Sequence, residues 1–167
     1  MKTEVKPVPF AARPKTFRPQ TGVENIGKIA DGLAAALSDT YALIMKTHAC
    51  HWNIVGPLFF SAHTLTEEHY KEMFAAADVI AERIRALGRL APASPVSASA
   101  ADALKPDASA REMIEALIAD HEALARLMHD LVEAAAEGGD PVTEDLATAR
   151  SAFHEKAAWM LRAMIAD

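Results

Sequence analysis

Apolar residues recur every three or four positions along four long stretches of the chain, which is the spacing of one face of an α-helix. Proline and glycine residues gather between these stretches, where they interrupt or end helices. The pattern therefore predicts four helices. They run from Thr21 to Val55, from near Ser61 to Leu87, from Ser109 to Gly138 and from Asp140 to the C-terminus.

Three of the predicted helices begin at a capping signal. Segments 21–24 and 109–112 read Thr-x-x-Glu and Ser-x-x-Glu, which is the capping-box pattern. Asp140 stands before Pro141, and this places an acidic N-cap residue before a proline at the first helical position. These signals set the expected starts of the first, third and fourth helices.

The links between the helices predict how they are arranged. The first and second helices are joined by a short link, and so are the third and fourth, which favours antiparallel neighbours. Residues 88–108 form a long link rich in alanine, serine and proline, in which Ser97–Leu104 is expected to form a short extra helix. One long crossover in the middle is typical of a ferritin-like four-helix bundle.

Composition agrees with an all-α fold in one domain. Alanine, the best helix former, accounts for 36 of the 167 residues, and aromatic residues make up only 6%. No apolar run approaches the roughly 20 residues of a membrane span, and the first ten residues lack the apolar stretch of a secretory signal. The single cysteine, Cys50, fits a reducing compartment, so a cytoplasmic protein is expected.

Two pairs of candidate metal ligands share one stripe of the second helix. His63 and Glu67 are four residues apart, and so are Asp78 and Glu82. Eleven residues separate Glu67 from Asp78, which at about 1.5 Å per residue is roughly 16 Å, too far for one metal to bridge. Two copies of the helix packed antiparallel across a two-fold axis near residues 72–73 would bring the pairs together.

His51, at the end of the first helix, is expected beside His63 because only a short loop joins the two helices. The resulting set of two imidazoles and three carboxylates suits iron, manganese or zinc. The Glu-x-x-His motif of di-iron sites inside a bundle is absent from the sequence, which favours a site between subunits. In the alternative interpretation, the three carboxylates are surface charges paired with Arg83 and Arg85.

The residues around these ligands form a specific sequence signature. It comprises His51-Trp-Asn-Ile-Val-Gly-Pro57, Phe59, His63, Glu67, Asp78, Ala81-Glu82-Arg83, Leu87-Gly88 and the closing segment Trp159-Met-Leu-Arg162. This signature resembles that of the Dps family, the miniferritins or DNA-binding proteins from starved cells. The resemblance covers residues 21–166 except for the 88–108 crossover.

The resemblance implies a hollow dodecamer with tetrahedral symmetry and ferroxidase sites at its two-fold interfaces. It assigns His51, His63 and Glu67 of one subunit, with Asp78 and Glu82 of the partner, as ligands of two iron ions. Glu67 departs from the family pattern, which more often has Asp at this position. The implied reaction is oxidation of Fe(II), with hydrogen peroxide preferred over oxygen, followed by storage of Fe(III) mineral inside the shell.

Further roles are expected near the site and at the start of the fourth helix. Trp52 is either an electron donor or an ordinary packed ring, and Cys50 is interpreted as a small buried residue. Asp140, Glu144 and Asp145 resemble the lining of the family's three-fold ion pore. Acids at a helix start also serve as caps, so this assignment has a structural alternative.

Residues 1–20 are expected to form a flexible basic tail, and residues 21–167 the helical domain. The tail carries a net charge of +4, whereas the whole chain carries −6, so the remaining 147 residues carry −10. Sequence-independent DNA binding through the tail and association with the nucleoid follow from the resemblance. In the alternative interpretation of the tail, it is a solubilising extension. Two alternatives remain for the whole protein. One is a nucleoid-compacting protein with a secondary or inactive metal site, and the other is a purely structural bundle. The basic tail residues are Lys2, Lys6, Arg13, Lys15 and Arg18.

Overall fold

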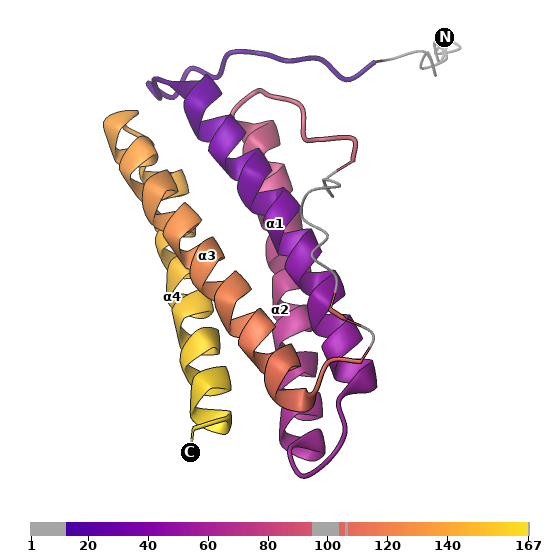
Figure 1. The fold of residues 1–167 in the computed structure, drawn as a ribbon. Coiled ribbons are helices and arrows are strands. Elements are labelled where there is room, and N and C mark those ends of the chain that lie inside the picture. Colours follow the sequence, from indigo (N-terminus) through magenta and orange to yellow (C-terminus); the bar gives the residue numbers. More distant parts are fainter. Residues whose placement is uncertain (1–12, 95–103, 106, 167) are drawn as a thin grey trace, which may run out of the picture.

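Four long α-helices make up the computed structural model, which describes residues 13–94, 104–105 and 107–166. No β-strand occurs in this part of the chain, so the predicted all-α fold is confirmed. The helices are α1 (Ile26–Asn53), α2 (Phe59–Ala86), α3 (Ala110–Glu137) and α4 (Pro141–Met164) (Figure 1).

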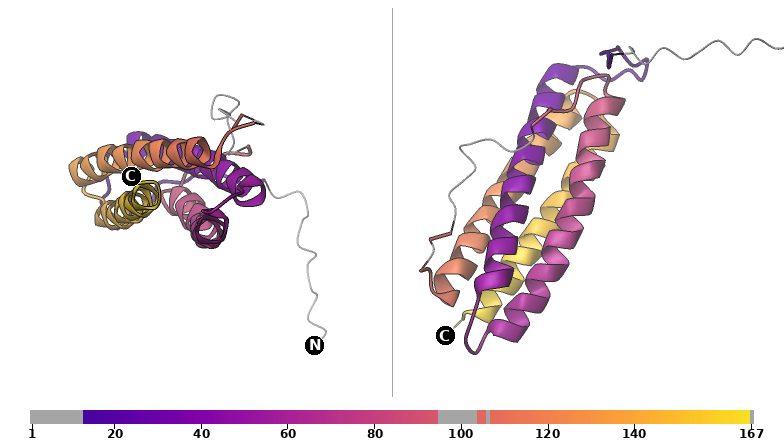
Figure 2. Two further views of the ribbon diagram at one scale, coloured as in Figure 1. Left: turned by 60° about the horizontal axis from the view of Figure 1, so that its bottom comes forward. Right: turned by 90° about the vertical axis from the view of Figure 1, so that its right-hand side faces the viewer.

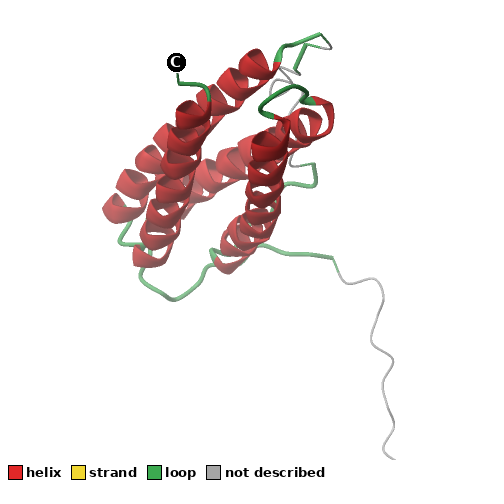
Figure 3. Ribbon diagram, turned by 90° about the horizontal axis from the view of Figure 1, so that it is seen from below, coloured by secondary structure: helices red, strands yellow, loops and turns green. Residues whose placement is uncertain are grey.

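The helices form two antiparallel hairpins, α1 with α2 and α3 with α4, that pack side by side (Figures 1 and 2). Helix α1 also packs against α3. Helix α2 ends at one end of the bundle, and α3 begins at the other end (Figure 1). Figure 3 shows the helices of the bundle and the loops that join them, seen from below. Buried apolar side chains of the helices form one core. The predicted ferritin-like bundle with one long crossover is therefore confirmed.

Two of the three predicted helix starts are confirmed. Ser109 and Glu112 form the expected capping box, in which the backbone N–H of Ser109 donates to the Glu112 carboxylate at 2.7 Å. Asp140 caps α4 by accepting a hydrogen bond at 3.1 Å from the backbone N–H of Thr143, and Pro141 opens the helix. The side chains at these two starts therefore satisfy N–H groups that have no partner within the helix.

The capping box predicted at residues 21–24 is wrong. Helix α1 begins at Ile26, and Asn25 precedes it with a positive φ of 51° and no side-chain cap. The backbone N–H of Glu24 donates to the carbonyl of Gly138 at 2.8 Å, which ties this segment to the end of α3. A long-range contact therefore replaces the local signal.

Other boundaries differ by two residues. Helix α1 ends at Asn53 rather than Val55, and α2 begins at Phe59 rather than Ser61. Of the extra helix expected within the crossover, residues 97–103 lie outside the described residues, and Leu104 is not helical. The helical core is built from aliphatic and small side chains. None of the helices in the described part of the chain has the length and apolar character of a membrane span.

The extended segment 13–20 rests against the end of α2. The backbone N–H of Phe17 donates to the carbonyl of Gly88 at 2.9 Å. Gly88 has a φ of +77°, and a Cβ atom there would lie 1.9 Å from the carbonyl oxygen of Phe17. Glycine is therefore required at this position by both its backbone conformation and the close approach of the segment.

Candidate metal centre

His51 and His63 lie side by side where α1 and α2 meet. His51 occupies the last turn of α1, and His63 the start of α2, with five residues between the helices. Their rings are stacked with centroids 3.7 Å apart and planes 16° apart. The predicted pairing of these two histidines is therefore what the structure shows.

Each imidazole is oriented by the backbone of the other residue. Nδ1 of His51 lies 2.9 Å from the carbonyl oxygen of His63, and Nδ1 of His63 lies 2.9 Å from that of His51. A carbonyl only accepts, so both Nδ1 atoms carry a proton, and the lone pair of the neutral ring is then on Nε2. Backbone bonds of this kind fix the tautomer of histidines that bind metals.

Thr66 adds a second contact to His51 that the sequence did not indicate. Its hydroxyl donates to the carbonyl of Ala62 at 2.6 Å and lies 3.3 Å from Nδ1 of His51. Thr66 is fully buried, and His51 is only 8% exposed. The His51 ring is thus held by two neighbours on α2.

Glu67 lies one helical turn beyond His63 and forms an ion pair with Lys71. The hydrogen bond from Lys71 and its positive charge lower the pKa of Glu67, and nearby His51 and His63 act in the same direction. The carboxylate is therefore ionised, as a metal ligand must be. Lys71 is a partner that the sequence analysis missed, although the i, i+4 spacing indicates it.

Asp78 and Glu82 are exposed residues further along α2, eleven and fifteen positions beyond Glu67. Within the described residues, no three histidine, cysteine, aspartate or glutamate side chains are grouped to hold a metal ion. The chain therefore brings together His51 and His63, with Glu67 nearby, and leaves Asp78 and Glu82 apart. The two-fold arrangement that would unite them stays a prediction.

The arginines that were the alternative partners of these carboxylates are engaged elsewhere. Arg83 donates to Asp140 at 2.6 Å and to the hydroxyl of Thr143 at 2.9 Å. Arg85 donates to the carbonyl of Arg89 at 2.8 Å. Among the described residues, no ion pair joins either arginine to an acid of α2. Arg83 and Arg85 are therefore not the partners of Asp78 and Glu82 that the alternative interpretation requires.

Aromatic rings connect the histidine pair to the surface. Trp52 is 66% exposed and stacks on His48 with centroids 5.2 Å apart and planes 5° apart. His48 lies 4.0 Å from the ring of Tyr70, which meets His51 edge-on at 5.4 Å. Trp52 is therefore not a buried packing ring within the chain. Tyr70 is a neighbour of the site that no sequence pattern indicates.

The middle of the bundle holds histidines in place of a carboxylate site. His69, His121 and His154 are buried, and Nδ1 of His121 lies 3.0 Å from Nδ1 of His154. Thr66 and Ser151 precede His69 and His154 by three residues, where a di-iron bundle site has glutamates. The ordinary site inside the bundle is thus not formed by these residues.

Burial decides the protonation of the groups in this core. It lowers the pKa of His69 to about 4 and that of His154 to about 3, and Arg150 lowers the latter further. Burial also raises the pKa of the Cys50 thiol to about 11. Cys50 is fully buried, so its prediction as a small buried residue is confirmed.

The three acids at the start of α4 differ in exposure. Asp140 is 1% exposed, and its carboxylate accepts hydrogen bonds from Arg83 and from Thr143. Burial alone would raise the pKa of Asp140, but these hydrogen bonds outweigh it and lower the pKa. Asp140 therefore acts as a helix cap in this chain, whereas Glu144 is half-buried and Asp145 is exposed.

The predicted tail residues are only partly described. Arg13, Lys15 and Arg18 lie exposed in the extended segment 13–20, whereas Lys2 and Lys6 lie outside the described residues. Since Phe17 is bonded to Gly88, this end of the tail rests on the helical domain. The flexibility expected of residues 1–20 stays a prediction.

Comparison with known proteins agrees with the fold. The ferritin-like domain family matches residues 30–167. A low temperature-induced protein of Nostoc is 41% identical over 134 residues, covering 77% of this chain and 75% of that protein. DNA protection during starvation protein 2 of Bacillus anthracis is 33% identical over 141 residues, covering 83% and 97%. The Dps crystal structure from Vibrio cholerae, from a ferritin-like diiron-carboxylate superfamily, has a TM-score of 0.79 and 28% identity, covering 89% and 97%.

A four-helix bundle with one long crossover, matched over most of its length, defines a ferritin-like protein. Within that class, the chain belongs to the Dps family, whose members are similar to it in both sequence and structure.

Proposed function

We propose that this protein is a ferroxidase and iron-storage protein that also protects DNA. Iron storage and DNA protection are supported in general by its membership of the Dps family and of the ferritin-like diiron-carboxylate superfamily. The observation that carries the proposal for this chain is the reciprocal bonding of His51 and His63, which leaves both Nε2 atoms as lone-pair donors. Two such nitrogens beside an ionised Glu67 suit Fe(II).

The site is completed by a second subunit in this proposal. Antiparallel packing of two α2 helices places Asp78 and Glu82 of one copy against the histidine pair of the other. Phe74, close to the proposed two-fold axis, is 61% exposed, so this face of α2 has apolar surface for such packing. Repetition of the pairing by tetrahedral symmetry gives a homododecamer with a hollow interior.

The reaction uses two ferrous ions at each site. Each Fe(II) loses one electron, and one hydrogen peroxide takes up both electrons and two protons to give two waters. Three carboxylates stabilise the higher charge of the two Fe(III) ions. Because the peroxide is reduced by two electrons, no hydroxyl radical is released. Hydrogen peroxide is the preferred oxidant over oxygen in this proposal. Zinc or manganese suits the same donors as a substitute metal.

Trp52 supplies an electron when only one ferrous ion is present. Its stacking on His48, and the contact of His48 with Tyr70 beside His51, support this role.

Iron ions enter through a pore near the start of α4. Asp140 caps the start of this helix, whereas Glu144 and Asp145 do not. Glu144 and Asp145 are therefore the acids that line the pore in this proposal.

DNA is bound without sequence preference through the basic tail, which places the protein at the nucleoid in the cytoplasm. Its charge of +4 opposes the −10 of the helical domain. Twelve tails on one shell bind multivalently although one tail binds weakly. The contacting residues are Lys2, Lys6, Arg13, Lys15 and Arg18.

Anaerobic titration of Fe(II) followed by peroxide, with the assembly mass measured on the same sample, tests the proposal. We expect about two Fe(II) bound per site and one peroxide consumed for each two Fe(II) oxidised. A monomer that oxidises no Fe(II) would remove the proposal. DNA compaction without Fe(II) oxidation would favour the alternative, a nucleoid-compacting protein whose metal site is inactive.

A further inference from the structure

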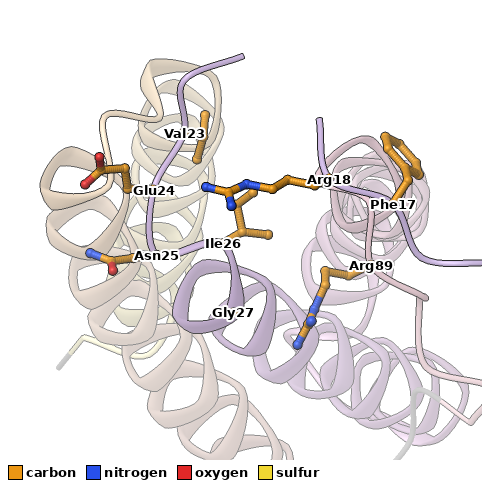
Figure 4. Close-up of a pocket in the computed structure, with 8 residues that line it drawn as sticks. All are labelled: Phe17, Arg18, Val23, Glu24, Asn25, Ile26, Gly27 and Arg89. Atoms are coloured by element: carbon orange, nitrogen blue, oxygen red, sulfur yellow. The ribbon is translucent and has the colours of Figure 1, made fainter. Parts of the chain in front are cut away.

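Two arginines from separate parts of the chain line one pocket at the start of α1. Arg18 comes from the extended segment 13–20, and Arg89 follows the end of α2 (Figure 4). The pocket has a volume of about 310 Å³ and is bounded on its other side by the first residues of α1. A Cβ atom on Gly27 would lie 4.0 Å from Nη2 of Arg89, so this guanidinium lies along the pocket wall.

Neither guanidinium is neutralised within the described part of the chain. Ion pairs there engage Arg83, Arg150 and Arg162, but neither Arg18 nor Arg89. Glu24 is the acidic residue in the lining, and Figure 4 shows its carboxylate pointing away from Arg18. Figure 4 shows the two guanidinium groups pointing in different directions along the pocket. Two unpaired cations that line one pocket attract an anionic ligand.

The position of Arg18 is fixed by its neighbour. Phe17 donates its backbone N–H to the carbonyl of Gly88 at 2.9 Å, and Arg89 is the next residue after Gly88. The two arginines therefore come from segments that are bonded together directly beside them. An anion that contacts both guanidinium groups finds their backbones already in place, which reduces the entropy lost on binding.

The surroundings extend the positive charge. Arg13 and Lys15 belong to the same extended segment as Arg18, and Arg85 donates to the carbonyl of Arg89 at 2.8 Å. Residues 21–167 carry a net charge of −10, so an anion meets an attractive potential at this end of the molecule and repulsion over most of the rest.

We infer that Arg18 and Arg89 form a phosphate-binding site on the helical domain, and that its ligand is the sugar–phosphate backbone of DNA. Arginine suits this ligand because its planar guanidinium donates two parallel hydrogen bonds to phosphate oxygens. The inference rests on the proposed DNA binding through the tail, and extends the contact from the tail onto the end of α2. Contacts of this kind carry no sequence preference.

The test compares the full-length protein with the R18A/R89A double variant and with a matched control, R126A/K156A. The control removes the same charge from exposed residues of α3 and α4. DNA affinity is measured by fluorescence anisotropy at several salt concentrations, with the assembly mass confirmed for each protein. We expect R18A/R89A to bind at least about tenfold more weakly and to show a smaller salt dependence. The control is expected to stay within about twofold of the unaltered protein.

A second arm measures inorganic phosphate by calorimetry and separates the two sources of this ligand. The unaltered protein could bind phosphate but no DNA, with phosphate binding lost in R18A/R89A. That result would support the site and contradict the DNA-binding part of the proposed function. Alternatively, all three proteins could bind DNA equally, and phosphate binding could be independent of the two arginines. That result would overturn the site and leave the proposed function intact.

Discussion

His51 and His63 orient each other through the backbone, because each ring bonds the other residue's carbonyl oxygen at 2.9 Å. The same two bonds join the end of α1 to the start of α2. The contacts that hold the hairpin closed therefore also set which nitrogen is available to a metal. Since the acceptors are main-chain atoms, replacing one histidine leaves the orientation of the other intact.

Replacing His63 by alanine therefore removes one ligand and keeps the tautomer of the other. We expect Fe(II) oxidation by peroxide to slow by at least about 100-fold in His63→Ala and in His51→Ala, since losing even an outer partner of a ligand costs 10- to 100-fold. Stopped-flow absorbance after anaerobic loading with Fe(II) measures this rate.

His129→Ala is the matched control for these variants. This exposed histidine of α3 contacts Ser151 and Glu155 of α4, in the hairpin that does not contain His51 and His63. Its replacement should leave the oxidation rate unchanged, and all variants should keep the assembly mass of the unaltered protein. Fast oxidation in a variant that lacks both His51 and His63 would show that iron is oxidised elsewhere.

The fold follows from the sequence where the signals are local. The capping box at Ser109, the Asp140–Pro141 pair and the long link before α3 were all interpreted correctly, because each acts within a few residues or through chain length. The signal at residues 21–24 failed because Glu24 bonds to Gly138, more than a hundred residues away. A distant contact of this kind leaves no local pattern.

The site is predictable from the sequence to a similar extent. The i, i+4 spacing paired His63 with Glu67, and the short loop placed His51 beside His63. The ring tautomers, however, depend on carbonyl positions that only the folded hairpin defines. Arg83 illustrates the limit, because its partner Asp140 lies 57 residues further along the chain. Asp78 and Glu82 need a second copy of the chain, which one sequence implies only through periodicity.

Removing the Lys71 side chain should strengthen metal binding. Lys71 holds Glu67 in an ion pair, so a metal ion must displace it before the carboxylate can bind. We expect Lys71→Ala to bind Fe(II) or Zn²⁺ about two- to fivefold more tightly at low salt, a range typical of an exposed pair. Calorimetry at two salt concentrations measures the difference, which high salt should abolish because salt screens the pair.

Lys156→Ala provides the control, because it removes an exposed lysine of α4 and the same unit of charge. A general effect of net charge would strengthen metal binding equally in both variants. In that case the interpretation of Lys71 as a competitor for Glu67 would be wrong.

Gly88→Ala should detach the extended segment from α2. The new Cβ atom would lie 1.9 Å from the carbonyl oxygen of Phe17, and the φ of +77° is itself unfavourable for alanine. We expect faster tryptic cleavage after Lys15, which is followed by Thr16, measured by mass spectrometry. Gly22→Ala is the matched control because Gly22 has a φ of +80°, and a Cβ atom there would meet no atom within 4 Å beyond its chain neighbours. Equal cleavage in both variants would mean that backbone strain alone, and not the Phe17 contact, controls the segment.

Acid should destabilise the bundle through the buried histidines. Burial lowers the pKa of His154 from 6.5 to about 3. Burial also lowers the pKa of His121, and positive charge on His154, His69 and Arg150 lowers it further. Above pH 6.5 both the folded and unfolded states hold these rings neutral, so their contribution to stability is complete. Below pH 6.5 only the unfolded state takes up the protons. The free energy of unfolding therefore falls by about 1.4 kcal/mol per pH unit for each such histidine.

The double variant His121→Leu/His154→Leu isolates this effect. It removes both rings and the buried nitrogens Nε2 that lack a hydrogen-bond partner in the described structure, so its stability near pH 7.5 should be close to that of the unaltered protein. Between pH 6 and pH 4, its urea midpoint should fall less steeply with acid, at a fixed protein concentration because assembly contributes to stability. His129→Leu, at an exposed position, should keep the original steepness. If the double variant loses stability with acid as steeply as the unaltered protein, then other groups, such as the carboxylates of the ion pairs, control the acid response.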